Sequence, residues 1–74
     1  MKKLAGVYSI TNITNGKMYI GSSLSINRRW YYHKKDLRNN KHGSDHLQKA
    51  WNKYGEKNFV FSIVQIITNE EDNI

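Results

Sequence analysis

The sequence contains no cysteine and no proline, and its apolar runs are only a few residues long. Without cysteine, neither a disulfide framework nor a thiolate zinc site can hold the fold together. A membrane-spanning helix would need a run of roughly 18 or more apolar residues. Lys2 and Lys3 are not followed by the apolar segment of a signal peptide. These absences predict a soluble domain from a reducing compartment.

The charge of the chain is strongly positive. Twelve Lys and Arg against six Asp and Glu give a net charge of +6 in only 74 residues, enough for one small domain. Nine of the basic side chains, but only three acidic ones, fall within residues 28–57. Such a field favours a polyanionic partner, most commonly nucleic acid. A merely soluble basic surface is equally compatible with the charge alone.

The first third of the chain has the pattern of a β-hairpin. Gly6–Thr11 and Lys17–Gly21 alternate with the two-residue period of strands and are rich in strand-forming residues. Between them lies Asn15-Gly16, a pair that tolerates positive φ and favours a tight reversal. We expect Gly21 to end the second strand.

Two helices are predicted next. Ile26, Trp30, His33 and Leu37 recur on one face of a helix that Asn39–Gly43 ends. Ser44 can cap a second helix, and Gly55 is typical of its end. The buried side of this second helix is expected to carry Leu47, Ala50, Trp51 and Tyr54.

The last third is predicted to complete a small sheet. Phe59–Ile67 is almost wholly apolar or β-branched, which is typical of a strand covered on both faces. Thr68–Glu71 has the pattern of a helix start, a capping residue followed by carboxylates. The fold class is therefore α+β: a small three-stranded antiparallel sheet flanked by helices, in the order β-β-α-α-β, with a third helix only begun at the C-terminus.

Two tyrosine motifs make the pattern specific. Gly6-Val7-Tyr8 and Tyr19-Ile20-Gly21 are separated by ten residues, and Arg29 and His33 follow in the first predicted helix. Asn52–Gly55 closes the second. Over essentially all 74 residues, this arrangement resembles the GIY-YIG nuclease superfamily, most closely the N-terminal catalytic domain of phage and intron-encoded homing endonucleases. Val7 departs from the family's usual isoleucine.

The four motif side chains can converge. Tyr8 and Tyr19 lie on adjacent strands, and Arg29 and His33 are one helical turn apart. Arginine suits bidentate contact with a phosphate, and histidine titrates near neutral pH. Each residue taken alone has a structural interpretation: packing for the tyrosines, a solvated charge for Arg29 and a half-buried polar group for His33. The helix pattern also leaves open a second pair, which is one residue earlier: Arg28 and Tyr32.

The resemblance implies a reaction. Tyr8, Tyr19, Arg29 and His33 occupy the positions of catalytic residues: a phenol helped by histidine as general base, and arginine on the scissile phosphate. It also implies a single Mg²⁺ held by a glutamate in the helix after the third strand. That glutamate is expected past Ile74, so no metal ligand is assigned. We expect residues 1–74 to be a single domain that lacks its C-terminal catalytic helix, binds DNA weakly and cleaves it poorly.

Further expectations follow. His42 is predicted to be an auxiliary active-site or phosphate contact. The partner is DNA, with no membrane and no small-molecule cofactor, and the protein is expected to be a cytoplasmic monomer in a bacterial or phage-infected cell. The alternative function is a non-enzymatic basic DNA-binding module; an interaction domain for an acidic protein leaves the tyrosine motifs unexplained. The predicted DNA contacts are Arg28, Lys34, Lys35, Arg38, Lys41 and Lys53.

Overall fold

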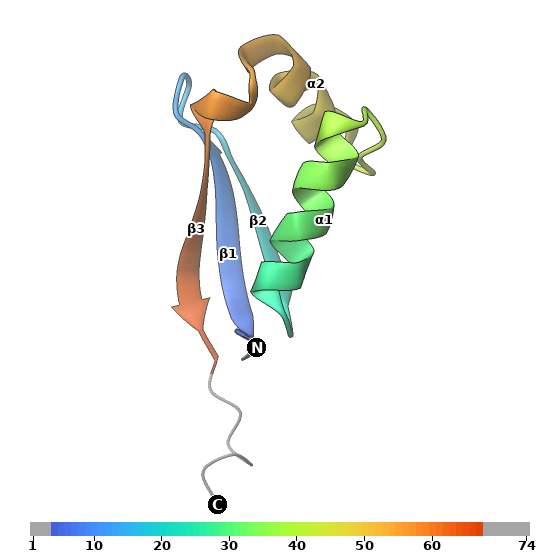
Figure 1. Ribbon diagram of the computed structural model, residues 1–74. Helices are drawn as coiled ribbons and strands as arrows, with labels where there is room; N and C mark the ends of the chain where they lie inside the picture. The colour runs from blue at the N-terminus through green and yellow to red at the C-terminus, as the bar shows by residue number, and fades with distance from the viewer. Residues whose placement is uncertain (1–3, 68–74) are drawn as a thin grey trace, which may run out of the picture.

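The structure is a computed structural model that describes residues 4–67. It contains three strands, two helices and a short 3-10 helix: β1 (Gly6–Asn12), β2 (Met18–Ser23), α1 (Ile26–Arg38), α2 (Asp45–Tyr54), η1 (Glu56–Asn58) and β3 (Phe59–Ile66). β1 lies in the centre and pairs antiparallel with both neighbours, in the order β2-β1-β3. The helices lie against one side of this sheet (Figure 1). The α+β prediction is confirmed; the third helix predicted from Thr68 lies outside the described residues.

The hairpin forms where the sequence predicts it. Asn12 donates its backbone N–H to the carbonyl of Lys17 at 2.8 Å, and Gly16 adopts a φ of 77°. Only glycine takes this left-handed conformation without steric cost, so the Asn-Gly pair sets the reversal. The expectation that Gly21 ends the second strand is wrong, because β2 continues to Ser23 and Gly21 pairs with Tyr8.

The core lies between the helices and the facing side of the sheet. α1 contributes Ile26 and Leu37 to it, and α2 contributes Leu47 and Trp51. The Trp51 ring packs on Phe59 of β3 with centroids 5.3 Å apart. Burial of these apolar side chains fixes which face of each helix points inward, and it therefore fixes the direction of the polar residues between them.

The ends of α2 follow its capping residues. The Ser44 hydroxyl accepts the backbone N–H of Leu47 at 3.3 Å, and Asp45 stands in the first turn. Gly55 donates its backbone N–H to Trp51 at the C-terminal end. Ser25 occupies the N-cap position of α1, but its side chain makes no capping hydrogen bond. Within residues 4–67, neither helix has the length and apolarity that crossing a membrane requires.

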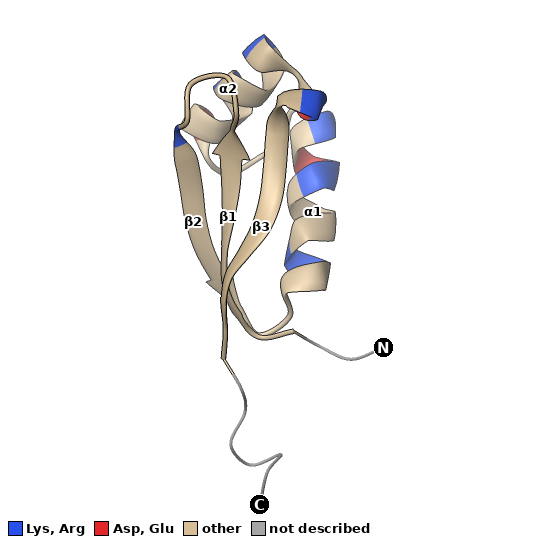
Figure 2. Ribbon diagram, turned by 90° about the vertical axis from the view of Figure 1, so that its left-hand side faces the viewer, with Lys and Arg blue, Asp and Glu red and all other residues tan. Residues whose placement is uncertain are grey.

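β3 corrects one expectation. The sequence predicts a strand covered on both faces, but Val60, Val64 and Ile66 are exposed. Val60 pairs with Thr11 on the face opposite Tyr8 and Ile10, and this face is open because α1 and α2 both lie on the other side of the sheet. Ile66 pairs with Gly6 beyond a register shift, on the same face as Tyr8, and is exposed there as well. Figure 2 shows the strands in front of the helices, and no helix or strand of residues 4–67 covers the outer face of the sheet. An apolar composition predicts a strand, but it does not specify how many of its faces are covered.

Candidate active site

Tyr8 and His33 meet in the interior. Tyr8 points from the central strand toward α1, and His33 lies on the inward stripe of that helix. The phenol oxygen is 2.7 Å from Nε2 of His33. Their exposed fractions are 2% and 7%. The packing of Ile26 and Leu37 on the same stripe turns His33 inward, which is how the apolar pattern of α1 positions a polar group.

Gly21 makes room for the Tyr8 phenol. A Cβ atom at Gly21 would stand 2.4 Å from the phenol oxygen and 2.5 Å from Cζ of Tyr8. Real Cβ contacts do not approach so closely. The glycine of the second tyrosine motif is therefore required by the tyrosine of the first, across the β1–β2 ladder, and not by a bend in the strand.

His42 extends the hydrogen-bonded pair into a chain. Its Nε2 is 2.7 Å from Nδ1 of His33, and the two rings stack with centroids 4.9 Å apart. The backbone N–H of Ser44 donates to Nδ1 of His42 at 3.0 Å. The chain therefore runs from the start of α2, through the α1–α2 loop, to the central strand.

The Ser44 amide sets the direction of every bond in this chain. A backbone N–H can only donate, so Nδ1 of His42 carries no proton and its Nε2 does. Nε2 of His42 then donates to Nδ1 of His33, which leaves the proton of neutral His33 on Nε2. His33 therefore donates to the phenol oxygen of Tyr8. In this arrangement Tyr8 accepts from His33, and its own O–H is directed elsewhere.

Beside the hydrogen-bonded side chains of His42 and His33 is a surface hollow of about 390 Å³. Tyr19 packs against it with its ring centroid 5.6 Å from that of His33. Tyr8 is not among the lining residues, but its phenol oxygen is hydrogen-bonded to His33, which lines the hollow. The structure thus gathers the predicted residues Tyr8, Tyr19, His33 and His42, with Arg29 at the rim. The hollow is lined by Tyr19, Arg29, Tyr32, His33, Asp36, His42, Gly43 and Ser44.

Burial and nearby charge perturb both central groups. The pKa of His33 is lowered to about 4, mainly by burial and also by His42 and Arg29, against the opposing effect of Asp36. Burial also raises the pKa of Tyr8, as does Tyr19, whereas Arg29 lowers it. Desolvation disfavours the charged form of each group. At neutral pH the site therefore holds a neutral imidazole and a protonated phenol.

The His33 pKa makes the stability of the fold depend on pH. Unfolded His33 titrates near 6.5 and folded His33 near 4, so between these values the unfolded chain binds more protons. Stability is therefore full above pH 6.5 and falls as pH drops toward 4, by up to about 3 kcal/mol from this group. Urea unfolding at a series of pH values measures this loss.

Two histidine variants isolate that contribution. His33→Gln removes the titrating group, so we expect most of the loss between pH 6.5 and pH 4 to disappear. His46 is exposed on α2, and His46→Gln serves as the matched control that keeps the wild-type pH dependence. An unchanged pH dependence in His33→Gln would contradict this assignment.

The two candidate pairs of α1, Arg29 with His33 and Arg28 with Tyr32, differ in their position relative to the hollow. Arg29 and His33 both line the hollow, whereas the Arg28 guanidinium lies over the Tyr32 ring, 5.8 Å from its centroid. Tyr32 also lines the hollow, but Arg28 does not. The geometry therefore favours Arg29 and His33 as the pair that can act together on one phosphate.

Three of the predicted DNA contacts, Lys34, Lys35 and Arg38, line a common surface hollow, and the other three do not line it. Arg38 donates from Nε to Glu56 at 2.9 Å, in the one ion pair found among residues 4–67. Lys34 lies over the ring of Phe61. Lys53 belongs to α2 and lies over Tyr54. The remaining predicted contacts, Arg28, Lys35 and Lys41, are exposed, and basic residues recur along α1 in Figure 2.

Gln48 is a site-building residue that the sequence analysis missed. It is 7% exposed, and its amide oxygen accepts the backbone N–H of His42 at 3.0 Å. Its amide nitrogen donates to the Leu37 carbonyl at 3.0 Å and to Asn52 at 3.0 Å. Gln48 therefore holds the loop that carries His42 against the end of α1. Its only sequence signal is a polar residue beside Leu47 on the apolar side of α2.

The described residues offer little to a magnesium ion. Among residues 4–67 there is no group of three or more His, Cys, Asp or Glu side chains that could hold a metal. Asp36 is the only carboxylate lining the hollow, and the ring nitrogens of His33 and His42 are all engaged in hydrogen bonds. Mg²⁺ prefers several oxygen ligands. These residues therefore do not form a magnesium site by themselves.

Comparison with known proteins shows the family of the chain. Residues 4–73 match the GIY-YIG catalytic domain family. Over 70 residues, the chain is 41% identical to "Intron-associated endonuclease 1" of Enterobacteria phage T4. This alignment covers 95% of this chain and 28% of that protein. It is 36% identical over 70 residues to "Probable intron-encoded endonuclease 1" of Neurospora crassa, covering 95% and 22%.

Solved structures give the same result. The catalytic domain of homing endonuclease I-TevI superimposes with a TM-score of 0.82 at 40% identity, covering 95% of this chain and 75% of that one. A mutant of the I-TevI catalytic domain gives a TM-score of 0.81 at 41% identity, covering 96% and 72%. The chain belongs to the GIY-YIG endonuclease family. It spans only about a quarter of the length of the curated relatives, 28% and 22%.

Proposed function

We propose that this chain is the catalytic domain of a DNA endonuclease that hydrolyses phosphodiester bonds with Tyr8 as general base. The observation that carries the proposal is the hydrogen-bonded chain from Ser44 through His42 and His33 to Tyr8, beside a hollow with Arg29 at its rim. Family membership supports the substrate class.

In the proposed reaction, Tyr8 first loses its proton to solvent, the resulting phenolate takes a proton from the attacking water, and the leaving sugar oxygen takes up a proton from solvent. Nε2–H of His33 stabilises the phenolate by donating to its oxygen, and the positive charge of Arg29 favours the same state. His33 does not remove the Tyr8 proton in this arrangement, because its Nε2 already carries one. The role of His33 and His42 is therefore to hold the base oxygen and fix the direction of its hydrogen bond.

Arg29 is proposed to bind the scissile phosphate. Within residues 4–67 it forms no ion pair, so its guanidinium is available to a phosphate at the hollow. A planar guanidinium can contact two phosphate oxygens and stabilise the charge that develops as water adds to phosphorus and the sugar oxygen leaves. Residues 4–67 do not supply the set of oxygen ligands that a magnesium ion needs, so no step is assigned to a metal.

The flanking DNA is proposed to lie along the basic residues of the helices. Phosphate contacts from Arg28, Lys35 and Lys41 supply affinity without reading sequence, because phosphates carry no base information. Arg38 contributes less, since Glu56 already neutralises it. This contact set predicts binding that weakens steeply as salt rises. Lys34 and Lys53 are proposed as further contacts.

We expect Arg29→Lys to lower the rate of DNA cleavage by a factor of about 10²–10³, because lysine keeps the charge but loses the bidentate geometry. The measurement is single-turnover nicking of supercoiled plasmid with Mg²⁺, using the protein expressed from its full reading frame.

Arg28→Lys is the matched control on the neighbouring position. Because Arg28 lies over Tyr32 and outside the hollow, this change should alter DNA affinity modestly and the rate of bond cleavage by less than about threefold. A larger rate loss for Arg28→Lys than for Arg29→Lys would show that the wrong arginine has been assigned.

A further inference from the structure

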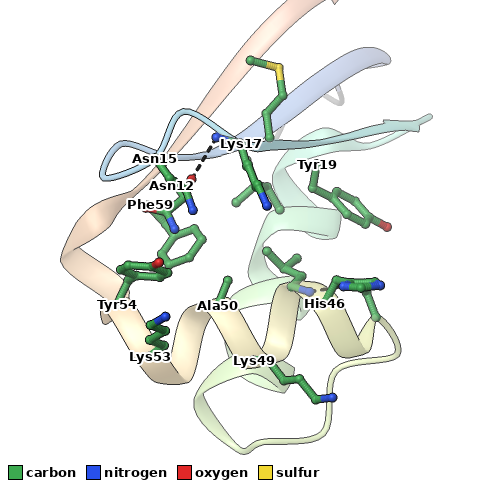
Figure 3. Close-up of a pocket in the computed structure, with 14 residues that line it drawn as sticks. Asn12, Asn15, Lys17, Tyr19, His46, Lys49, Ala50, Lys53, Tyr54 and Phe59 are labelled. Carbon is green, nitrogen blue, oxygen red and sulfur yellow. Dashed lines mark hydrogen bonds between the residues drawn. The ribbon is translucent and has the colours of Figure 1, made fainter.

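A second cavity adjoins the candidate active site. It has a volume of about 430 Å³ and lies between the β1–β2 hairpin and α2 (Figure 3). Tyr19 and Ser44 line both this pocket and the hollow beside His33. The two cavities are therefore neighbours with these two residues in common. The apolar lining of the second cavity comes from Ile10, Met18, Leu47, Ala50 and Phe59.

The polar lining of this pocket is cationic. Lys17 enters from the hairpin, and Lys49, Lys53 and His46 belong to α2, while no Asp or Glu is among the lining residues. Figure 3 shows Lys17 directed from the hairpin toward α2. The ammonium of Lys53 lies 5.2 Å from the centroid of the Tyr54 ring, which also lines the pocket. Charge and an aromatic face thus stand together.

The pocket also contains an unsatisfied donor. Asn12 is 3% exposed and lines the pocket, and its amide Nδ2 has no hydrogen-bond partner among the described residues. Its Oδ1 is engaged, since it accepts the backbone N–H of Thr14 at 2.9 Å. Buried amide groups are almost always hydrogen-bonded. The nitrogen exposes almost no surface to the pocket, so it marks a buried polar group in the wall and not a ligand contact.

We propose that this pocket is a subsite for one nucleotide of the DNA strand next to the cleaved bond. Lys17 and Lys53 hold its phosphate, and the apolar lining with Tyr54 takes the sugar and base. Pockets of about 300–1,000 Å³ suit ligands of this size. Base–aromatic contact does not depend on sequence, so the subsite serves positioning. The proposal rests on the proposed endonuclease function.

The charges argue against other occupants. A second copy of this chain carries a net charge of +6, so it would be repelled from a lysine-lined pocket. A neutral apolar peptide would bury the lysines without a counter-charge, which is unfavourable. A nucleotide matches both the cationic rim and the apolar lining.

The first test is NMR titration of the ¹⁵N-labelled 74-residue chain with thymidine 3′,5′-bisphosphate, in the absence of metal. We expect the largest amide shifts at Lys17, Ala50 and Tyr54. Shifts confined to the hollow of Arg29 and His33, or spread evenly along α1, would overturn the subsite. Either of those patterns leaves the proposed endonuclease function standing, because the titration requires no cleavage.

Two kinds of variant then separate charge from shape. Lys17→Gln/Lys53→Gln should weaken binding of the bisphosphate about tenfold, because two charge-assisted contacts are lost. Ala50→Leu fills the pocket without changing charge and should weaken it by a similar factor. Lys57→Gln removes a lysine outside the pocket and should leave the affinity within twofold. Equal affinities for all three variants would contradict the proposal and indicate a non-specific charge effect.

Discussion

We expect Tyr8→Phe to lower the rate of DNA cleavage by a factor of about 10²–10⁴ while changing DNA affinity by less than twofold. The substitution removes one hydroxyl from the position proposed for the general base, and losses of this size are typical of such groups. Tyr8 is buried and does not line the hollow, so it contributes little surface to DNA binding. Plasmid nicking and fluorescence anisotropy with labelled duplex, on the protein from its full reading frame, measure the two quantities.

The pH profile separates a base from a packing residue. If the phenolate is the reactive form, the rate rises about tenfold per pH unit below the raised pKa of Tyr8. Tyr8→Phe should remove this slope as well as the rate. A lost rate with an unchanged slope would assign the base to another group.

Tyr31→Phe is the matched control for Tyr8→Phe. Tyr31 is 62% exposed on α1, so loss of its hydroxyl should leave the rate unchanged within about twofold. A non-enzymatic DNA-binding module would be indifferent to Tyr8→Phe and would lose affinity on replacement of Lys34 and Lys35. Retention of full cleavage activity by Tyr8→Phe would end the proposal that this phenol is the base.

The elements could be predicted because their signals are local. Asn15-Gly16 specifies a tight reversal between two alternating segments, and a helical stripe places His33 on the same face as Ile26 and Leu37. Ser44 and Gly55 mark the ends of α2. Each of these depends on residues within a few positions of one another, where backbone geometry and burial leave few alternatives.

The contacts between elements could be predicted only in part. The His42–His33 bond depends on the α1–α2 loop, where Asn40 adopts a φ of 59° and Gln48 holds the His42 backbone. Nothing in the spacing of the two histidines specifies that geometry. The donor and acceptor roles of the two histidines depend on the backbone amide of Ser44, which donates to His42. The sequence predicts only the capping role of the Ser44 side chain.

Two errors have the same origin. Gly21 was expected to end a strand because glycine weakens strands locally. Its actual constraint is the phenol of Tyr8 on the neighbouring strand. The apolar character of Phe59–Ile67 predicted burial on both faces, whereas the described structure covers one face of the sheet. In both cases the deciding contact is distant in sequence and absent from any local pattern. The roles assigned to the site residues stay predictions.

We expect Gly21→Ala to destabilise the fold by at least about 2 kcal/mol and to lower the cleavage rate by about 10²-fold or more. The added methyl would stand 2.4 Å from the Tyr8 oxygen, so the ring must move. Its neighbours leave little room, because Tyr8 packs edge-on against Trp30 and is hydrogen-bonded to His33. Displacement of a catalytic group by about 1 Å can cost 10²-fold in rate. Urea unfolding and plasmid nicking measure the two effects.

Gly43→Ala shows whether this effect belongs to Gly21 or to the loss of any glycine. A Cβ at Gly43 would meet no atom within 4 Å, so its free energy of unfolding should stay within about 0.5 kcal/mol of the wild-type value. Because the Gly21 methyl acts by moving Tyr8, its variant should also lose the His33–Tyr8 hydrogen bond, which the His33 imidazole resonances report in NMR spectra. A Gly21→Ala protein with wild-type stability and unchanged imidazole resonances would mean that the phenol does not need the space the glycine leaves.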